Sequence, residues 1–81
     1  MYFVYILRSR KFPKRIYTGH TENIKNRIRA HNNGECVYTK NFKPWKIICL
    51  VCFPNKKLAI NFEKYLKTGS GVAFARKHLI N

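Results

Sequence analysis

With 81 residues, the chain has room for one domain of modest stability, which excludes a two-domain protein. A hydrophobic fraction of 46% excludes a disordered chain, because disordered chains are poor in apolar residues. The formal charge of +14, from 17 basic and 3 acidic residues, favours a polyanionic partner, and nucleic acid is the expected one.

A membrane surface is the competing partner for so basic a chain. No apolar run approaches the roughly 18 to 20 residues that a membrane-spanning helix needs. Residues 1–4 also lack the basic segment that precedes the apolar part of a signal peptide. We therefore expect a soluble, cytoplasmic protein with no membrane partner.

The N-terminal part of the chain has the pattern of a β-hairpin. Residues 2–7 are rich in aromatic and β-branched side chains, which predicts a strand. A basic stretch over residues 8–14 interrupts this pattern, and residues 15–19 predict a second short strand. In such a hairpin Tyr5 and Tyr17 can share one face of the sheet.

A helix is predicted next, with Thr21 as its N-cap, an end near Asn32 and Gly34 as the stop. Its apolar stripe follows the helical spacing. Arg27 and His31 fall on or beside that stripe and not on the opposite, solvated face. A surface arginine with no special role would more naturally lie on the solvated face.

The C-terminal half predicts one more strand and two helices. Residues 35–44 look like a basic loop, and Trp45–Phe53 is a nearly continuous apolar run that suits a central, buried third strand. Pro54-Asn55 opens a helix that stops at Gly69, and a last helix is expected over residues 72–80. The prediction is an α+β domain with three strands and about three helices.

A short turn, Gly69-Ser70-Gly71, separates the last two predicted helices. Two glycines before a helix can present backbone N–H groups to a phosphate. The turn can equally act as a simple hinge between the helices. Both interpretations stay open from the sequence.

The acidic residues are few enough to consider one by one. A hard divalent cation with carboxylate and water ligands is well suited to phosphodiester cleavage. Glu22 is explained by the first turn of a helix and Glu35 by an exposed loop. Glu63 lies beside the apolar stripe of its helix and is the expected metal ligand. The alternative is an ion pair with Lys67 at i+4.

Three other candidate residues also have a structural explanation. Arg27 can lay its stem over neighbouring isoleucines, although a guanidinium beside an apolar stripe also suits bidentate phosphate binding. Tyr5 and Tyr17, taken singly, can be ordinary strand or core aromatics. Only their combination with Glu63 singles out a function.

That combination resembles the GIY-YIG endonuclease family over essentially the whole chain. The two tripeptides of the family name correspond to Val4-Tyr5-Ile6 and Tyr17-Thr18-Gly19, residues 23–27 look like the family's arginine-bearing helix, and Glu63 falls where the family places its metal ligand. The chain is similar in particular to the small single-domain branch, related to the nuclease domain of bacterial nucleotide-excision repair proteins. The resemblance implies a three-stranded antiparallel sheet flanked by helices.

The resemblance also implies catalytic roles. Tyr17 would act as general base or orient the attacking water, Tyr5 would position water or phosphate, and Arg27 would hold the scissile phosphate. Glu63 would bind one Mg²⁺ or Mn²⁺, and His31 matches a histidine of some members. A tyrosine with its usual pKa of about 10 is a poor base, so this role needs a metal ion, basic surroundings or a proton relay.

Further residues are expected to contact nucleic acid. His20 stands where some repair relatives have a lysine, which makes it a partial positive helper at neutral pH. The remaining candidates are basic or turn residues, namely Lys40, Lys43, Lys67 and Ser70.

The predicted function is a metal-dependent endonuclease that hydrolyses DNA phosphodiester bonds, is structure-selective and is linked to DNA repair or recombination. RNA stays open as a substrate, and a protein partner could supply specificity. The alternative is a non-catalytic nucleic-acid-binding module in which Tyr38 and Trp45 stack on bases. A basic interaction module for ribosome or RNA explains the charge but not the combination of Tyr5, Tyr17, Arg27 and Glu63.

Overall fold

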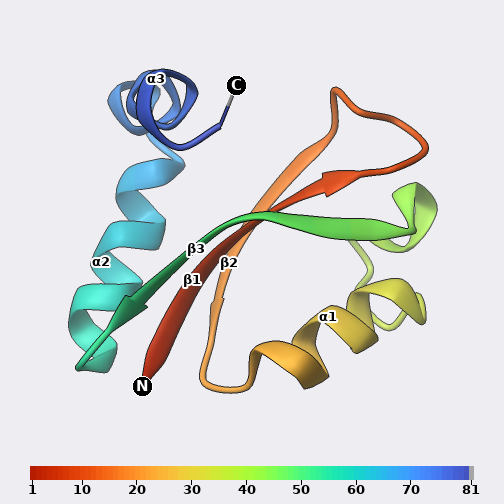
Figure 1. The fold of residues 1–81 in the computed structure, drawn as a ribbon, viewed down its shortest axis with the longest axis horizontal. Helices are drawn as coiled ribbons and strands as arrows, with labels where there is room; N and C mark the ends of the chain where they lie inside the picture. The colour runs from red at the N-terminus through yellow and green to blue at the C-terminus, as the bar shows by residue number, and fades with distance from the viewer. Residues whose placement is uncertain (81) are drawn as a thin grey trace.

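The structure, a computed structural model, describes residues 1–80 as an α+β domain, as predicted. Figure 1 shows a sheet running between α1 on one side and α2 with α3 on the other. None of the helices in the described chain is long and apolar enough to cross a membrane. The elements in chain order are β1 (Tyr2–Ser9), β2 (Ile16–Thr21), α1 (Ile24–Asn32), the 3₁₀ turn η1 (Lys40–Phe42), β3 (Trp45–Phe53), α2 (Lys56–Leu66) and α3 (Gly69–His78).

The sheet is antiparallel with the strand order β2-β1-β3, so β1 is the central strand. The prediction that Trp45–Phe53 forms the central, buried strand was therefore wrong, although its bounds were right. Ile47 and Leu50 are exposed on this edge strand, at 40% and 46%. The apolar run was misleading because residues of β3 pack into both hydrophobic clusters, one on each face of the sheet. An edge strand that is covered in this way has the same apolar sequence as a central strand.

Two apolar cores form because successive side chains of β1 point to opposite faces of the sheet. Val4 and Ile6 pack with residues of α2 and α3 on one face. On the other face, Tyr5 and Leu7 pack with Trp45 and with isoleucines of α1. The central strand thus joins two hydrophobic layers, and the residues of β2 divide between the same two faces.

Helix α1 begins two residues later than predicted. Thr21 pairs with Phe3 and belongs to β2, so it cannot be the N-cap. Asn23 caps the helix, because its side-chain oxygen accepts a hydrogen bond from the Asn26 N–H at 3.1 Å. Gly34 has a positive φ of 76°, a backbone conformation that favours glycine, and the predicted stop is confirmed.

Helix α3 begins earlier than predicted, at Gly69, because Thr68 caps it by accepting a hydrogen bond from the Gly71 N–H at 3.0 Å. The Gly69-Ser70-Gly71 segment is therefore the first turn of α3 and not a separate hinge. The prediction that Gly69 stops the preceding helix was also wrong, because α2 ends at Leu66. Gly71 is needed for close packing, because a Cβ there would lie 1.7 Å from the carbonyl oxygen of Tyr65 in α2.

The segment before β3 is more ordered than the basic loop predicted for residues 35–44, since it contains η1. Trp45, which follows it, is only 4% exposed. Its indole N–H donates a hydrogen bond of 2.9 Å to the carbonyl of Thr39. The prediction that Trp45 stacks on a nucleic-acid base was therefore wrong, because the ring is part of the core.

Candidate active site

A buried polar chain links Tyr5 of β1 to α1 and to the segment beyond it. The hydroxyl of Tyr5 lies 3.0 Å from Nε2 of His31, and Nδ1 of His31 lies 2.7 Å from the hydroxyl of Thr39. Burial, with a contribution from Arg27, lowers the pKa of His31. A neutral imidazole donates through one nitrogen and accepts through the other, so these groups form one polarised chain.

Tyr17 lies beside this chain on β2. Its ring centroid is 5.0 Å from that of His31 and 6.4 Å from that of Tyr5. The two tyrosines share a face of the hairpin, as predicted, because Tyr5 pairs with Gly19 and Tyr17 with Leu7. A Cβ on Gly19 would lie 2.5 Å from the Tyr5 hydroxyl, so the ring occupies the space that glycine leaves.

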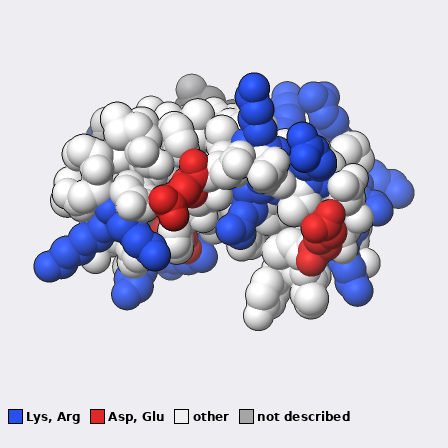
Figure 2. All heavy atoms as spheres, turned by 90° about the horizontal axis from the view of Figure 1, so that it is seen from below, with Lys and Arg blue, Asp and Glu red and all other residues white. Residues whose placement is uncertain are grey.

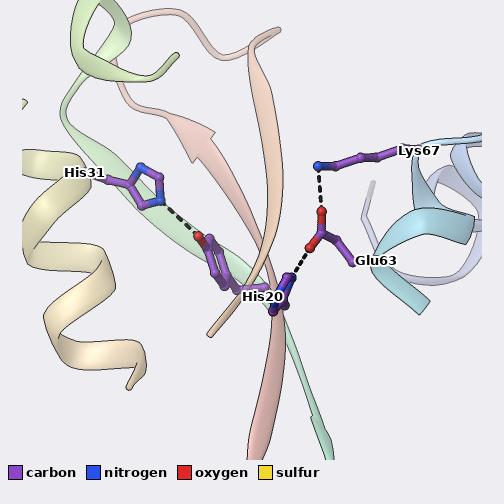
Figure 3. Close-up of polar contacts among 5 residues, drawn as sticks. His20, His31, Glu63 and Lys67 are labelled. Carbon is purple, nitrogen blue, oxygen red and sulfur yellow. Dashed lines mark hydrogen bonds and ion pairs between the residues drawn. The ribbon is translucent and has the colours of Figure 1, made fainter. Parts of the chain in front are cut away.

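Glu63 approaches the same strand from α2, on the opposite face. Its Oε1 accepts a hydrogen bond from Nδ1 of His20, and its Oε2 accepts one of 2.6 Å from the Lys67 ammonium. His20 reaches α2 because it is adjacent to Gly19 and points to the other side of the sheet. Figure 3 shows His31 on one side of the strands, with Glu63 and Lys67 on the other.

The i, i+4 ion pair offered as an alternative explanation of Glu63 is present, but it accounts for only part of the environment. An exposed pair of this kind contributes about 0.2–0.5 kcal/mol to helix stability. Glu63 also bonds His20 and is only 13% exposed. Burial acts to raise the pKa of its carboxyl, but the hydrogen bonds and charges of His20 and Lys67 lower it below the ordinary value.

The two halves of the site meet across the edge strand β2. The Lys67 ammonium, which pairs with Glu63, lies 5.9 Å from the centre of the Tyr17 ring. Burial is the main cause that raises the pKa of both Tyr5 and Tyr17, and the negative charge of Glu63 raises both further. The two phenols and the carboxylate therefore act on one another electrostatically, although they project from different faces of the sheet.

Arg27 supplies positive charge from α1. Its side chain is exposed, while Ile24 and Ile28 on the same helix pack against the core. Although burial dominates the shift, the charge of Arg27 acts to lower the pKa of both Tyr5 and Tyr17. Arg27 thus combines solvent access with an influence on both phenols, which suits a group that receives an anion from solution.

Three of the residues expected to contact nucleic acid take part in none of the hydrogen bonds or ion pairs described above. Lys40 and Lys43 are exposed in and just after η1, which Figure 1 places at the end of β3 away from α2. Ser70 is exposed in the first turn of α3. Figure 2 shows basic side chains spread across one face of the molecule, with small acidic patches between them.

Sequence reasoning missed Thr39 and the special position of Gly19. Thr39 is fully buried and orients His31 from eight residues further along the chain. A threonine in a basic loop carries no pattern that would single it out. Gly19 belongs to a recognised tripeptide, but its contact with Tyr5 depends on the pairing of β1 with β2.

The surroundings of Glu63 suit a divalent ion, such as Mg²⁺, that needs only one protein carboxylate. In the described residues, no three His, Cys, Asp or Glu side chains gather as a ready set of metal ligands. Mg²⁺ is commonly held by one or two carboxylates, with water and substrate phosphate completing its shell. A single partly buried carboxylate suits that arrangement, and the ammonium of Lys67 now supplies the positive charge beside it.

Comparisons with known proteins show the family to which this fold belongs. Residues 1–72 match the GIY-YIG catalytic domain. The structure is similar to the solution NMR structure of the UPF0213 protein BH0048 from Bacillus halodurans, with a TM-score of 0.56 and 27% identity, over 95% of this chain and 84% of that one.

Two curated relatives illustrate the range of similar proteins. The structure-specific endonuclease subunit SLX1 of Debaryomyces hansenii is 47% identical over 73 residues, which cover 82% of this chain and 21% of that protein. The UPF0213 protein CPE1444 of Clostridium perfringens is 41% identical over 68 residues, which cover 83% and 71%. The chain thus spans about a fifth of the SLX1 subunit and most of the UPF0213 protein.

Proposed function

Because the chain belongs to the GIY-YIG family, we propose that it is a metal-dependent endonuclease that hydrolyses DNA phosphodiester bonds. The observation that carries the proposal is the placement of two neutral phenols and one carboxylate on the two faces of the β1–β2 hairpin. Tyr5 of β1 and Tyr17 of β2 lie on one face of the sheet and Glu63 on the other, within electrostatic reach of both phenols.

The raised pKa of each tyrosine bears on its proposed role. A neutral phenol can orient a water molecule by hydrogen bonds without carrying a charge. We assign this task to Tyr17. Tyr5, which the sequence predicted to position water or phosphate, is fully buried and bonded to His31, so it acts as a positioning residue behind Tyr17 and does not itself touch water or phosphate. The oxygen of the attacking water forms a bond to phosphorus and the water gives up one proton, the phosphorus–oxygen bond to the leaving sugar breaks, and the leaving oxygen takes up one proton in return.

Arg27 and Glu63 complete the proposed site. A guanidinium binds phosphate oxygens through two parallel hydrogen bonds, so the exposed Arg27 would hold the scissile phosphate. Glu63 would hold one divalent ion, Mg²⁺ or Mn²⁺. When bound, such an ion neutralises charge at the phosphate and stabilises the leaving oxygen. In this role His20 and Lys67 keep the carboxyl of Glu63 ionised before the ion arrives.

Similarity to a structure-specific endonuclease subunit supports a substrate defined by nucleic-acid shape, and with it a role in DNA repair or recombination. The chain matches only part of that subunit, so a protein partner that supplies specificity belongs to the proposal. The competing function is a nucleic-acid-binding module without catalysis, which the net charge of +14 favours. The burial of Trp45 removes one of the two stacking side chains that this alternative invoked.

The test is cleavage of labelled single-stranded, duplex, flap and branched DNA with Mg²⁺, Mn²⁺ or EDTA. The wild type should yield products only with a divalent ion. Glu63→Ala should abolish the products while DNA affinity stays equal or rises, because a negative charge has been removed. Glu35→Ala, which removes an exposed acid, is the matched control and should keep full activity. Binding without wild-type products on any substrate would support the non-catalytic module.

A further inference from the structure

A groove adjoins the candidate active site, between the start of β2 and the helices α2 and α3. Its volume is about 480 Å³, within the range of about 300–1,000 Å³ in which proteins bind small organic molecules. Tyr17 and Lys67 line it, and Lys67 also pairs with Glu63, so the groove is next to the candidate active site. Its floor is apolar and belongs to the core, with Leu66 and Ala75 among its lining residues.

The walls of this groove carry positive charge. Lys14, Lys67 and Arg76 line it, and no acidic side chain does. Arg15 also lines the groove, but its guanidinium already makes a cation–π contact with the Phe42 ring, 4.5 Å from the ring centre. An apolar floor between cationic walls matches a ligand that has both an apolar face and negative charge.

The groove continues into a second hollow that shares Lys14 and Arg76 and adds Arg8. The Nε atom of Arg8 is buried and has no hydrogen-bond partner in the described structure. A buried donor without a partner is unfavourable, and a phosphate oxygen is a strong acceptor for a guanidinium. Arg8 therefore adds one more cationic side chain to the lining of this continuation.

We propose that this groove binds an unpaired nucleotide next to the scissile phosphate, an inference that rests on the proposed nuclease function. The base lies against the apolar floor, and the adjoining phosphates contact Lys14 and Arg76. A continuous duplex keeps its bases stacked and presents mainly phosphates. An apolar floor does not strengthen the binding of phosphates. The preferred substrate is therefore DNA with a single-stranded arm at the cleavage point, as in a flap.

Binding in EDTA tests the proposal without cleavage. Fluorescence anisotropy at fixed salt compares a flap, a duplex of equal length and charge, and the same flap with an abasic site as its first unpaired nucleotide. We expect the flap to bind about tenfold more tightly than the duplex, with most of this preference lost at the abasic site, since the abasic nucleotide has no base to bury against the apolar floor. Equal affinity for the intact and abasic flaps would overturn the proposal.

A pair of charge reversals on α3 tests the location. Arg76→Glu changes a residue that lines the groove, and Lys77→Glu makes the same change one position along, at an exposed residue outside it. Arg76→Glu should weaken flap binding about tenfold more than duplex binding, whereas Lys77→Glu should weaken both alike. Equal selectivity in the two variants, with both folded by circular dichroism, would refute the assignment to this groove.

The outcomes separate this inference from the proposed function. Metal-dependent cleavage without any base-dependent preference would overturn the groove assignment and leave the nuclease intact. A base-dependent preference that responds to Arg76→Glu, without cleavage, would support the groove and count against catalysis.

Discussion

The hydroxyl of Tyr5 and Nε2 of His31 lie 3.0 Å apart, in a buried contact that ties the central strand to α1. His31 is itself held by Thr39, so the Tyr5 hydroxyl is oriented by a chain of groups shielded from water. The cost of disturbing this contact can be measured as stability, independently of any activity.

His31→Phe should lower the free energy of unfolding by about 1–3 kcal/mol, because it leaves buried hydroxyls of Tyr5 and Thr39 without their partner. Urea denaturation measures this change. His78→Phe, an exposed histidine at the end of α3, should stay within about 0.5 kcal/mol of the wild type. Similar small effects of both substitutions would contradict a structural role for the buried chain.

The burial of His31 should also make the stability of the protein depend on pH. Burial lowers the pKa of folded His31 below its ordinary value of 6.5. Below that pH the unfolded chain takes up the proton first, so the free energy of unfolding should fall as the pH drops from about 7 toward the folded pKa. His31→Phe should remove this part of the slope. An unchanged slope between about pH 7 and 5 would show that His31 does not cause it.

Gly19→Ala should destabilise the protein by about 1–3 kcal/mol, because the new Cβ would lie 2.5 Å from the hydroxyl of the fully buried Tyr5. Gly69→Ala is the matched control, since nothing lies within 4 Å of its Cβ at the start of α3. It should be neutral or stabilise by up to about 1 kcal/mol. Thermal unfolding of both variants decides whether Tyr5 really occupies the space beside residue 19.

Tyr17→Phe should reduce the cleavage rate about 10²- to 10⁴-fold while leaving DNA affinity nearly unchanged, because it removes the hydroxyl to which we assign the orientation of the attacking water. Single-turnover kinetics and anisotropy measure the two quantities separately. Tyr38→Phe, at a side chain that is 80% exposed, should leave the cleavage rate unaltered. A rate loss equal in both variants would argue against a special role for Tyr17.

Arg27→Lys should lower cleavage at least about tenfold, because an ammonium keeps the charge but loses the two parallel hydrogen bonds of a guanidinium. Arg29→Lys makes the same exchange on the exposed part of the same helix and should change cleavage less than about twofold. The comparison of rates at saturating substrate distinguishes phosphate positioning from general charge. Full activity of Arg27→Lys would mean that charge alone is enough.

The helix boundaries show where local patterns reach their limit. Asn55 caps α2 close to where the chain pattern placed the helix start, because capping uses residues three apart in sequence. Thr21 has the same chemistry as a cap, yet its pairing with Phe3 keeps it in β2. Capping preferences compete with strand pairing, and a single sequence does not show which one prevails.

The sequence by itself determined the three strands, the start of α2 at Pro54-Asn55, the shared face of Tyr5 and Tyr17, and the resemblance that singled out Glu63. These features depend on local periodicity and residue type. The tertiary structure alone decided that β1 and not β3 is central, that Thr39 holds His31, and that Glu63 bonds His20 from 43 residues away. Such pairings depend on how distant segments pack across the sheet, and the spacing of residues along the chain does not encode that packing.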